Sequence, residues 1–267
     1  MVPLAGTSAN LGRILLGFVE EIGGISVLLG RILAQTPRIV RGGRLLADQM
    51  LEIGNRSMPL VFVVSIFTGA VTAVQASYQF QAYVPLILLS STVHRSVIIE
   101  LGPVLTALVV GGRVSASIAA ELGTMRVTEQ VDALEVMAVD PVRYLALPRF
   151  WAAVVMMPAL TVLANLLAIL GAWVVALLTV PGMTNHLFVE GLKLHFYLHD
   201  WMSGLAKAVV FGMIIAVTGC FYGLRAGGGA EGVGRATMKA VVANCLAILV
   251  LDYFLATVLF QILFGKG

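Results

Sequence analysis

The sequence predicts an all-α integral membrane protein, with an N-terminal helix in the membrane interface and about five transmembrane helices. Two observations carry this prediction. Of the 267 residues, 59% are hydrophobic and only 12% are charged, which leaves too little polar surface to cover a soluble domain of this length. No Asp, Glu, Lys or Arg occurs in residues 57–94 or 150–189, and about 20 apolar residues are enough to cross a bilayer.

The N-terminal part of the chain differs from the rest, because residues 11–52 alternate short apolar runs with charged residues. Such an alternation is typical of an amphipathic helix that lies in the membrane interface. Pro37 would divide it from a second piece, because proline interrupts helical hydrogen bonding. The alternative is a helical cap in the cytosol. We expect one domain over 1–267, with interfacial helices over 1–56 and the transmembrane region over 57–267.

Five stretches of the remaining sequence are long and apolar enough to form transmembrane helices. Polar or glycine-rich connections separate them, and the polar loop after the third stretch covers residues 181–200. The predicted spans are about 58–80, 85–112, 150–178, 202–224 and 239–263.

The distribution of Lys and Arg predicts how the chain is oriented in the membrane. Arginines are scattered singly over the connections before the first span, between the second and third, and between the fourth and fifth. The opposite connections hold only Lys193 and the terminal Lys266. The positive-inside rule therefore places the N-terminus in the cytoplasm and the C-terminus outside. In a soluble protein, the net charge of +3 would suggest nucleic-acid binding. Because the arginines are scattered singly over short loops, we attribute it to membrane topology instead.

The connection between the second and third spans is the most charged part of the sequence. As one helix over about 121–139, it would place Val131 and Leu134 on an apolar stripe and its charges on the other side. Thr124 would cap its N-terminus, and Asp140-Pro141 would end it. The pattern favours a loop helix that solvates its charges, and the alternative is a docking helix for a cytosolic partner. The charged residues are Glu121, Arg126, Glu129, Asp132 and Glu135.

Several motifs resemble those of the MlaE permease family, which includes bacterial MlaE, the YrbE proteins of Mce systems and the chloroplast TGD permeases. Within residues 100–151 these are ELGPV, the GR pair, AELGTMRVTEQVDALEVM and DPVRYL followed by PR. A second block over 227–255, GGGAEGVGRATMKAVVANCLAILVLDYFL, is similar to the C-terminal part of the family. With the number of spans, the resemblance covers the chain from about residue 45 onward.

The resemblance implies the permease subunit of an ABC transporter that moves phospholipid between the inner and outer membranes of a bacterium. Such permeases form homodimers on a dimer of cytosolic ABC ATPases. They bind a hexameric MCE-domain lipid-binding protein on the outer face. A small regulatory subunit is a further partner that the resemblance allows. The 121–139 segment would be the coupling helix, whose charges set its register on the ATPase. The protein would reside in the inner membrane, with its C-terminus in the periplasm.

Three ionisable residues interrupt the predicted spans: Glu100, Lys207 and Asp252. Charges at this depth normally face protein or water, so these residues either pair with one another or line a lipid path near the dimer cavity. Aromatic residues near the outer end of the first span are candidates for the wall of that path, or for an interfacial aromatic belt. They are Tyr78, Phe80 and Tyr83.

Two smaller features bear on how the helices pack. Asn165 and Asn244 lie within spans and are expected to form hydrogen bonds between helices. Gly219, Gly223 and Gly227 have the GxxxG spacing that permits close helix contact.

The sequence carries no signal for catalysis, for a resident cofactor or for a metal. It lacks a GxxxxGK[ST] phosphate loop, so ATP and magnesium would bind the partner ATPase. The outer-loop histidines have irregular spacing, and the two cysteines form no metal-ligand pattern. Two alternatives remain: an ion-coupled secondary transporter without an ATPase, which would use Glu100, Lys207 and Asp252 as a relay, and a membrane scaffold that transports nothing.

Overall fold

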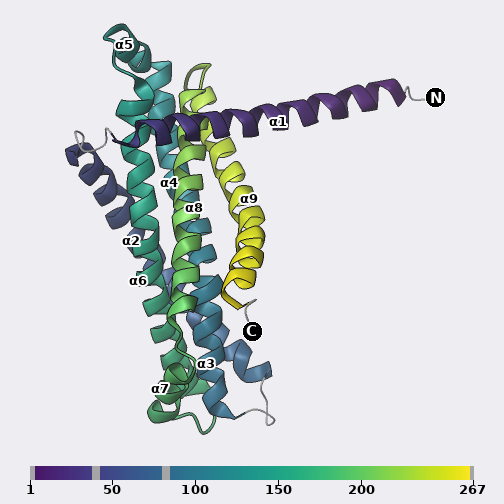
Figure 1. Cartoon of the computed structure of the whole chain (residues 1–267), viewed down its shortest axis with the longest axis vertical. Coiled ribbons are helices and arrows are strands. Elements are labelled where there is room, and N and C mark those ends of the chain that lie inside the picture. The colour runs from purple at the N-terminus through teal and green to yellow at the C-terminus, as the bar shows by residue number, and fades with distance from the viewer. Residues whose placement is uncertain (1–3, 38–42, 80–84, 265–267) are drawn as a thin grey trace.

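The computed structural model is a bundle of long helices, and it describes residues 4–37, 43–79 and 85–264 (Figure 1). All regular secondary structure in these residues is helical, which confirms the all-α fold. Five helical segments are long and apolar enough to cross a membrane, as expected from the sequence. Each extends several residues beyond the prediction at one end and lies within about two residues of it at the other. They cover Gly43–Gln79, Leu86–Val127, Val142–Thr179, Leu198–Leu224 and Gly229–Gln261.

Helix α1 (Leu4–Gln35) lies across one end of the bundle and projects sideways from it (Figure 1). Leu28 and Ile32 are buried against the bundle, whereas Val19 and Val27 are exposed. One apolar face of α1 thus packs on the bundle and another is exposed. This arrangement suits an interfacial helix, because the exposed apolar face can enter the edge of the bilayer.

Helix α2 (Gly43–Gln79) corrects one detail of the N-terminal prediction. Residues 43–56 do not form a separate interfacial helix; they continue without a break into the first span. The cause is local: these residues are mostly good helix formers without a proline, and Ile53 packs into the core with 3% exposure. The hinge predicted at Pro37 leads into residues 38–42, which lie outside the described residues.

The second and third spans each contain a short π-helical segment. The second span consists of α3 (Leu86–Ser96), η2 (Val97–Leu101) and α4 (Gly102–Val127). The third consists of η3 (Val142–Ala146) and α6 (Leu147–Thr179).

Both π-helical segments end two residues before a proline. Pro103 follows η2 and Pro148 follows η3 at the same offset. Proline has no N–H to donate and its ring crowds the carbonyl four residues earlier, so the preceding turn widens. Gly102 and Leu147 then donate to carbonyls five residues back.

Helix α8 (Leu198–Leu224) occupies the centre of the bundle and packs against α4, α6 and α9 (Gly229–Phe264). Helix α7 (Asn185–Leu194) packs on α3 at the end opposite α1. Helix α5 (Gln130–Val136) stands at the same end as α1, and so does the α8–α9 connection (Figure 1). The arginine-rich connections are therefore gathered at one end of the molecule, as the topology prediction requires.

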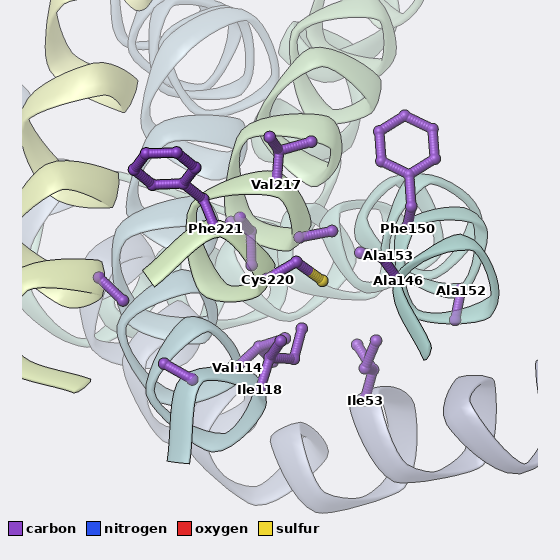
Figure 2. Close-up of a cluster of buried hydrophobic side chains, with 14 of the residues drawn as sticks. Ile53, Val114, Ile118, Ala146, Phe150, Ala152, Ala153, Val217, Cys220 and Phe221 are labelled. Carbon is purple, nitrogen blue, oxygen red and sulfur yellow. The ribbon is translucent and has the colours of Figure 1, made fainter. Parts of the chain in front are cut away.

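Glycine allows the helix backbones to approach closely. A Cβ added at Gly69 of α2 would overlap the backbone of Ala168 in α6, and one at Gly171 of α6 would overlap Ile66 of α2. In another part of the core, side chains from α2, α4, α6 and α8 meet, and small residues such as Ala153 and Cys220 lie between Phe150 and Val114 (Figure 2). Close backbone approach is how membrane helices gain packing energy, since lipid offers apolar contacts of its own.

Candidate functional site

Three helices bring the intramembrane charges together into one cluster, which we call the charge triad: Glu100, Lys207 and Asp252. The Lys207 ammonium donates to Glu100 Oε2 at 2.6 Å and to Asp252 Oδ1 at 3.0 Å. The Lys207 side chain is fully buried, whereas 42% of the Glu100 side chain and 20% of the Asp252 side chain are exposed. The pairing expected as one of two alternatives is thus present.

The π-helical turn positions Glu100 within this cluster. Glu100 is the fourth residue of η2, so the wide turn before Pro103 changes its direction relative to a regular α-helix. Gly102 is the first residue after η2 and packs against Asn165. A Cβ at this position would overlap the side-chain oxygen of Asn165. Gly204 of α8 packs on the η2 backbone at Ile98 in the same manner. These two contacts hold η2 against α6 and α8, with Lys207 three residues after Gly204.

The triad is polar, partly open and surrounded by apolar helices. A lone ammonium buried in a bilayer would be costly, and two carboxylates compensate it here. Glu100 is the most exposed member of the triad, whereas the Lys207 side chain has no exposed surface. The triad therefore places three mutually compensating charged groups inside an otherwise apolar bundle.

The aromatic residues predicted beside a lipid path are only partly described. Tyr78 is 70% exposed near the end of α2, and within the described residues it takes no part in the hydrogen bonds of the triad. Phe80 and Tyr83 lie outside the described residues. The lipid path remains a prediction for all of these positions.

A second ion pair at the α3–α7 end was not foreseen from the sequence. Arg95 Nε donates to Asp200 Oδ2 at 2.9 Å, and Asp200 is only 3% exposed. His195 Nδ1 lies 2.9 Å from Ser91 Oγ. The partners are more than a hundred residues apart, so no local spacing could reveal them. Among the described residues, no group of three His, Cys, Asp or Glu side chains is arranged to hold a metal ion.

The charged connection at the α1 end is organised differently from the single helix that the sequence suggested. Helix α4 continues to Val127, and Thr124 Oγ1 donates back to the Ala120 carbonyl instead of capping a helix. Glu129 then adopts a left-handed conformation, with φ of 61°, and α5 follows as seven residues only. The predicted helix over 121–139 is therefore two helices joined by a turn.

The end of α5 explains why this helix is short. Ala138 has φ of 57°, its N–H donates to the Glu135 carbonyl, and the N–H of Val139 donates to Leu134. This is a Schellman ending, which normally uses glycine at the left-handed position. Asp140 does not stop α5, but its Oδ1 accepts from the Val142 N–H and so starts the next helical segment.

Three of the five predicted coupling charges pair within the protein. Arg149 Nη2 donates to Glu121 Oε2 at 2.8 Å, and Arg126 donates to Asp132. Glu129 and Glu135 are exposed and form no ion pair within the described part of the chain. The charges that remain available to a partner are therefore these two carboxylates.

An exposed apolar patch beside them was missed by sequence reasoning. Val131 anchors α5 with 3% exposure, but Val136 is 88% exposed, Met137 64% and Tyr144 46%. We call these three residues the α5 tip. Large apolar side chains exposed near one another are typical of surfaces that contact other proteins. The signal in the sequence was the pair Val136-Met137 directly after the acidic residues, which neither the apolar stripe nor the charged side of the predicted helix included.

The two buried asparagines do not form the expected interhelical hydrogen bonds. Asn165 Oδ1 and both side-chain polar atoms of Asn244 are buried without a hydrogen-bond partner in the described residues. Asn244 instead packs against Gly111, where an added Cβ would lie 2.6 Å from its Nδ2 atom. The glycines behave as expected in part: Gly219 and Gly223 pack on α4, while Gly227 faces open space.

Comparison with known proteins places these features in a family context. A family model described as Permease MlaE matches residues 46–258. The chain is 40% identical over 218 residues to a probable ABC transporter permease of Rickettsia typhi, covering 82% of this chain and 84% of the relative.

Two further relatives extend the comparison. The chain is 32% identical over 251 residues to the intermembrane phospholipid transport system permease protein MlaE of Haemophilus influenzae, covering 94% of this chain and 96% of that protein. It is also 32% identical over 244 residues to the chloroplastic protein TRIGALACTOSYLDIACYLGLYCEROL 1 of Arabidopsis thaliana, covering 89% of this chain and 67% of that protein.

Proposed function

Because this chain belongs to the MlaE permease family, we propose that it is the membrane subunit of an ATP-driven transporter that moves phospholipid between the inner and outer membranes of a bacterium. The name of the Haemophilus influenzae relative supports the substrate class, and that of the Rickettsia typhi relative supports the ABC type. ATP hydrolysis is assigned to a separate chain, because this sequence lacks the phosphate loop that binds ATP.

The observation that carries the proposal is the charge triad inside an apolar bundle. A phospholipid head group brings phosphate oxygens into a region where water is scarce. Lys207 supplies the cation for such an oxygen, and the partly exposed Glu100 is the ligand that it would replace. Asp252 would keep Lys207 in position throughout. A lipid path needs apolar walls and a few convergent polar groups, and the triad fits the second requirement.

The α5 tip is the proposed contact with the cytosolic ATPase. Its apolar side chains, Val136 and Met137 above all, would enter a groove of the partner, and Glu129 and Glu135 would set the register. The arginine-rich connections at this end support an orientation in which it lies in the cytoplasm with the N-terminus. The C-terminus and the α3–α7 end would face the periplasm.

The remaining partners are proposed from the family. Two copies of this chain would pair in the inner membrane on an ATPase dimer, with a hexameric MCE-domain lipid-binding protein on the periplasmic face and a small regulatory subunit as a further component. No nucleic acid is expected as a partner. This chain would bind no cofactor itself, since ATP and magnesium belong to the ATPase.

The first experiment tests ATPase docking. Met137→Asp should reduce recovery of the ATPase with the tagged permease by about tenfold, because it places a charge in an apolar contact. Glu135→Lys should weaken recovery less. Glu190→Lys is the matched control, since Glu190 is exposed on α7 at the opposite end. Undiminished ATPase recovery with Met137→Asp would remove the α5 tip from the interface.

The second experiment tests the triad in the assembled complex. Asp252→Asn keeps a hydrogen-bond acceptor for Lys207 but removes a charge, so we expect reduced lipid transfer between vesicles with the complex intact. Loss of assembly would instead assign the triad a structural role. Transport driven by an ion gradient without any ATPase would favour the ion-coupled alternative.

A further inference from the structure

A cavity of about 290 Å³ opens at the α1 end, between α1, the last turn of α8 and the first turns of α9. Its lining combines aromatic and basic side chains: Phe221, Tyr222, Arg225, Arg235 and Lys239, with Glu21 from α1. It is separate from the charge triad, because Tyr222 follows Lys207 by 15 residues of helix, about 22 Å along the axis.

Packing between α1 and α8 fixes one wall of this cavity. Gly24 of α1 crosses directly over Phe221, where a Cβ would lie 2.6 Å from the ring. The Tyr222 hydroxyl donates to Glu21 Oε2 at 3.0 Å. The Arg225 guanidinium lies over the Phe221 ring, 4.3 Å from its centroid, an arrangement that favours the cation. Arg225 is thus held in place by a ring and not by an acid.

The charge balance of the cavity is positive. Within the described residues, Arg225 and Lys239 form no ion pair. Arg235 pairs with Glu231 at 3.2 Å, but their side chains are 66% and 80% exposed, and such pairs contribute little. Glu21 is the one carboxylate in the described lining, and one of its oxygens already accepts from Tyr222. Three cations therefore face one partly engaged anion.

The position of the cavity decides which anion it meets. It lies where α8 ends and α9 begins, at the boundary of two membrane spans. Beside it, α1 exposes Val19, Ile22 and Val27, which suit the interface between acyl chains and head groups. Basic pockets between helices at the cytoplasmic boundary are known sites for anionic head groups.

We propose that this cavity binds the phosphate group of an anionic lipid from the surrounding leaflet. Arg225 and Lys239 would contact the phosphate, Arg235 would leave Glu231 to join them, and the acyl chains would run along the open face of α1. The bound lipid would join α1 to the α8–α9 connection. This inference does not rest on the proposed transport function, since it concerns a different site and a binding measurement.

The test uses the full-length chain, purified in detergent and stripped of lipid, with lipid occupancy measured by native mass spectrometry. Phosphatidylglycerol should bind more tightly than phosphatidylcholine with the same acyl chains. Arg225→Gln and Lys239→Gln should each weaken phosphatidylglycerol binding about fivefold. Arg44→Gln is the matched control, because it removes an exposed arginine at the start of α2 and should change nothing.

A variant of opposite sign sharpens the test. Glu21→Gln removes the opposing carboxylate and should tighten phosphatidylglycerol binding, whereas Tyr222→Phe removes only the hydrogen bond and should leave it nearly unchanged. The gel-filtration profile and the melting temperature without added lipid identify any variant that fails to fold. If one of Arg225→Gln and Lys239→Gln fails to fold, the other still tests the site.

Three results would overturn the proposal. The first is equal binding of the two lipids, and the second is unchanged phosphatidylglycerol binding in both glutamine variants. The third is full displacement of the lipid by equimolar inorganic phosphate or glycerol phosphate, which would assign the cavity to a soluble anion.

Discussion

Helices α8 and α9 follow one another in the sequence and are similarly apolar, yet they have opposite environments. Within their most apolar windows, 67% of the α8 residues are buried in the protein, against 11% of the α9 residues. Helix α8 has glycine at 204, 212, 219 and 223, each against a neighbouring helix. The corresponding stretch of α9 carries exposed large residues such as Leu249, Val250 and Tyr253.

The difference shows that hydropathy locates a span but does not say what covers it. Lipid tails are as apolar as leucine, so large apolar side chains gain little by turning inward. Helix α8 is central because its glycines let backbones approach, and because Lys207 requires protein partners. Helix α9 is joined to it through Asp252 and leaves most of its surface to lipid or to another subunit.

The largest predicted effect comes from removing the cation that joins the two helices. Lys207→Met leaves Glu100 and Asp252 close together without their shared partner, so the free energy of unfolding should fall by about 3 kcal/mol. Titration with a denaturing detergent, followed by circular dichroism, would measure it. Lys239→Met on α9 is the matched control. Equal stability of both variants would mean that the triad does not hold α9 to α8.

Close backbone packing of α8 gives the second effect. A Cβ at Gly212 would lie 2.7 Å from the backbone oxygen of Ala153, so Gly212→Leu should lower the free energy of unfolding by about 2 kcal/mol. The comparable change on α9 is Gly234→Leu, where an added Cβ meets nothing within 4 Å. The same titration should separate these two variants, and a similar loss in both would contradict the contrast drawn between the helices.

The smallest effect should have the opposite sign. Gly234→Ala adds a methyl group into open space and reduces the freedom of the unfolded chain, so it should stabilise the protein by about 0.5 kcal/mol. Gly212→Ala, in contact with α6, should destabilise it. A thermal melt of the two variants side by side would resolve the difference in sign.

The sequence predicted the fold class and the number of spans, because the stretches without charges are long. It also singled out Glu100, Lys207 and Asp252, since charges are rare inside spans. Which of them pair depends on helix packing, and that follows from glycine contacts and from the wide turn before Pro103. Neither the glycine contacts nor the wide turn can be predicted from hydrophobic periodicity.

The charged connection failed as a single helix for a related reason. Glu129 before α5 and Ala138 after it adopt left-handed conformations. Neither residue is a glycine, which is the residue that normally indicates such a turn. Helical periodicity therefore ran through the break at Glu129, and Val136 and Met137 were not singled out by the helical pattern. The residues that best fit a partner surface are the ones that the pattern did not select.

Helix α1 has a consequence for where the whole bundle sits. A helix that lies flat at one boundary of the bilayer, with apolar side chains toward the acyl region, holds that end at a constant depth. If the membrane thickens or thins, the adjustment must occur at the far end, where α3 and α7 meet the opposite boundary. The charge triad would then keep a fixed distance from the boundary at which α1 lies, whatever the thickness of the bilayer around it.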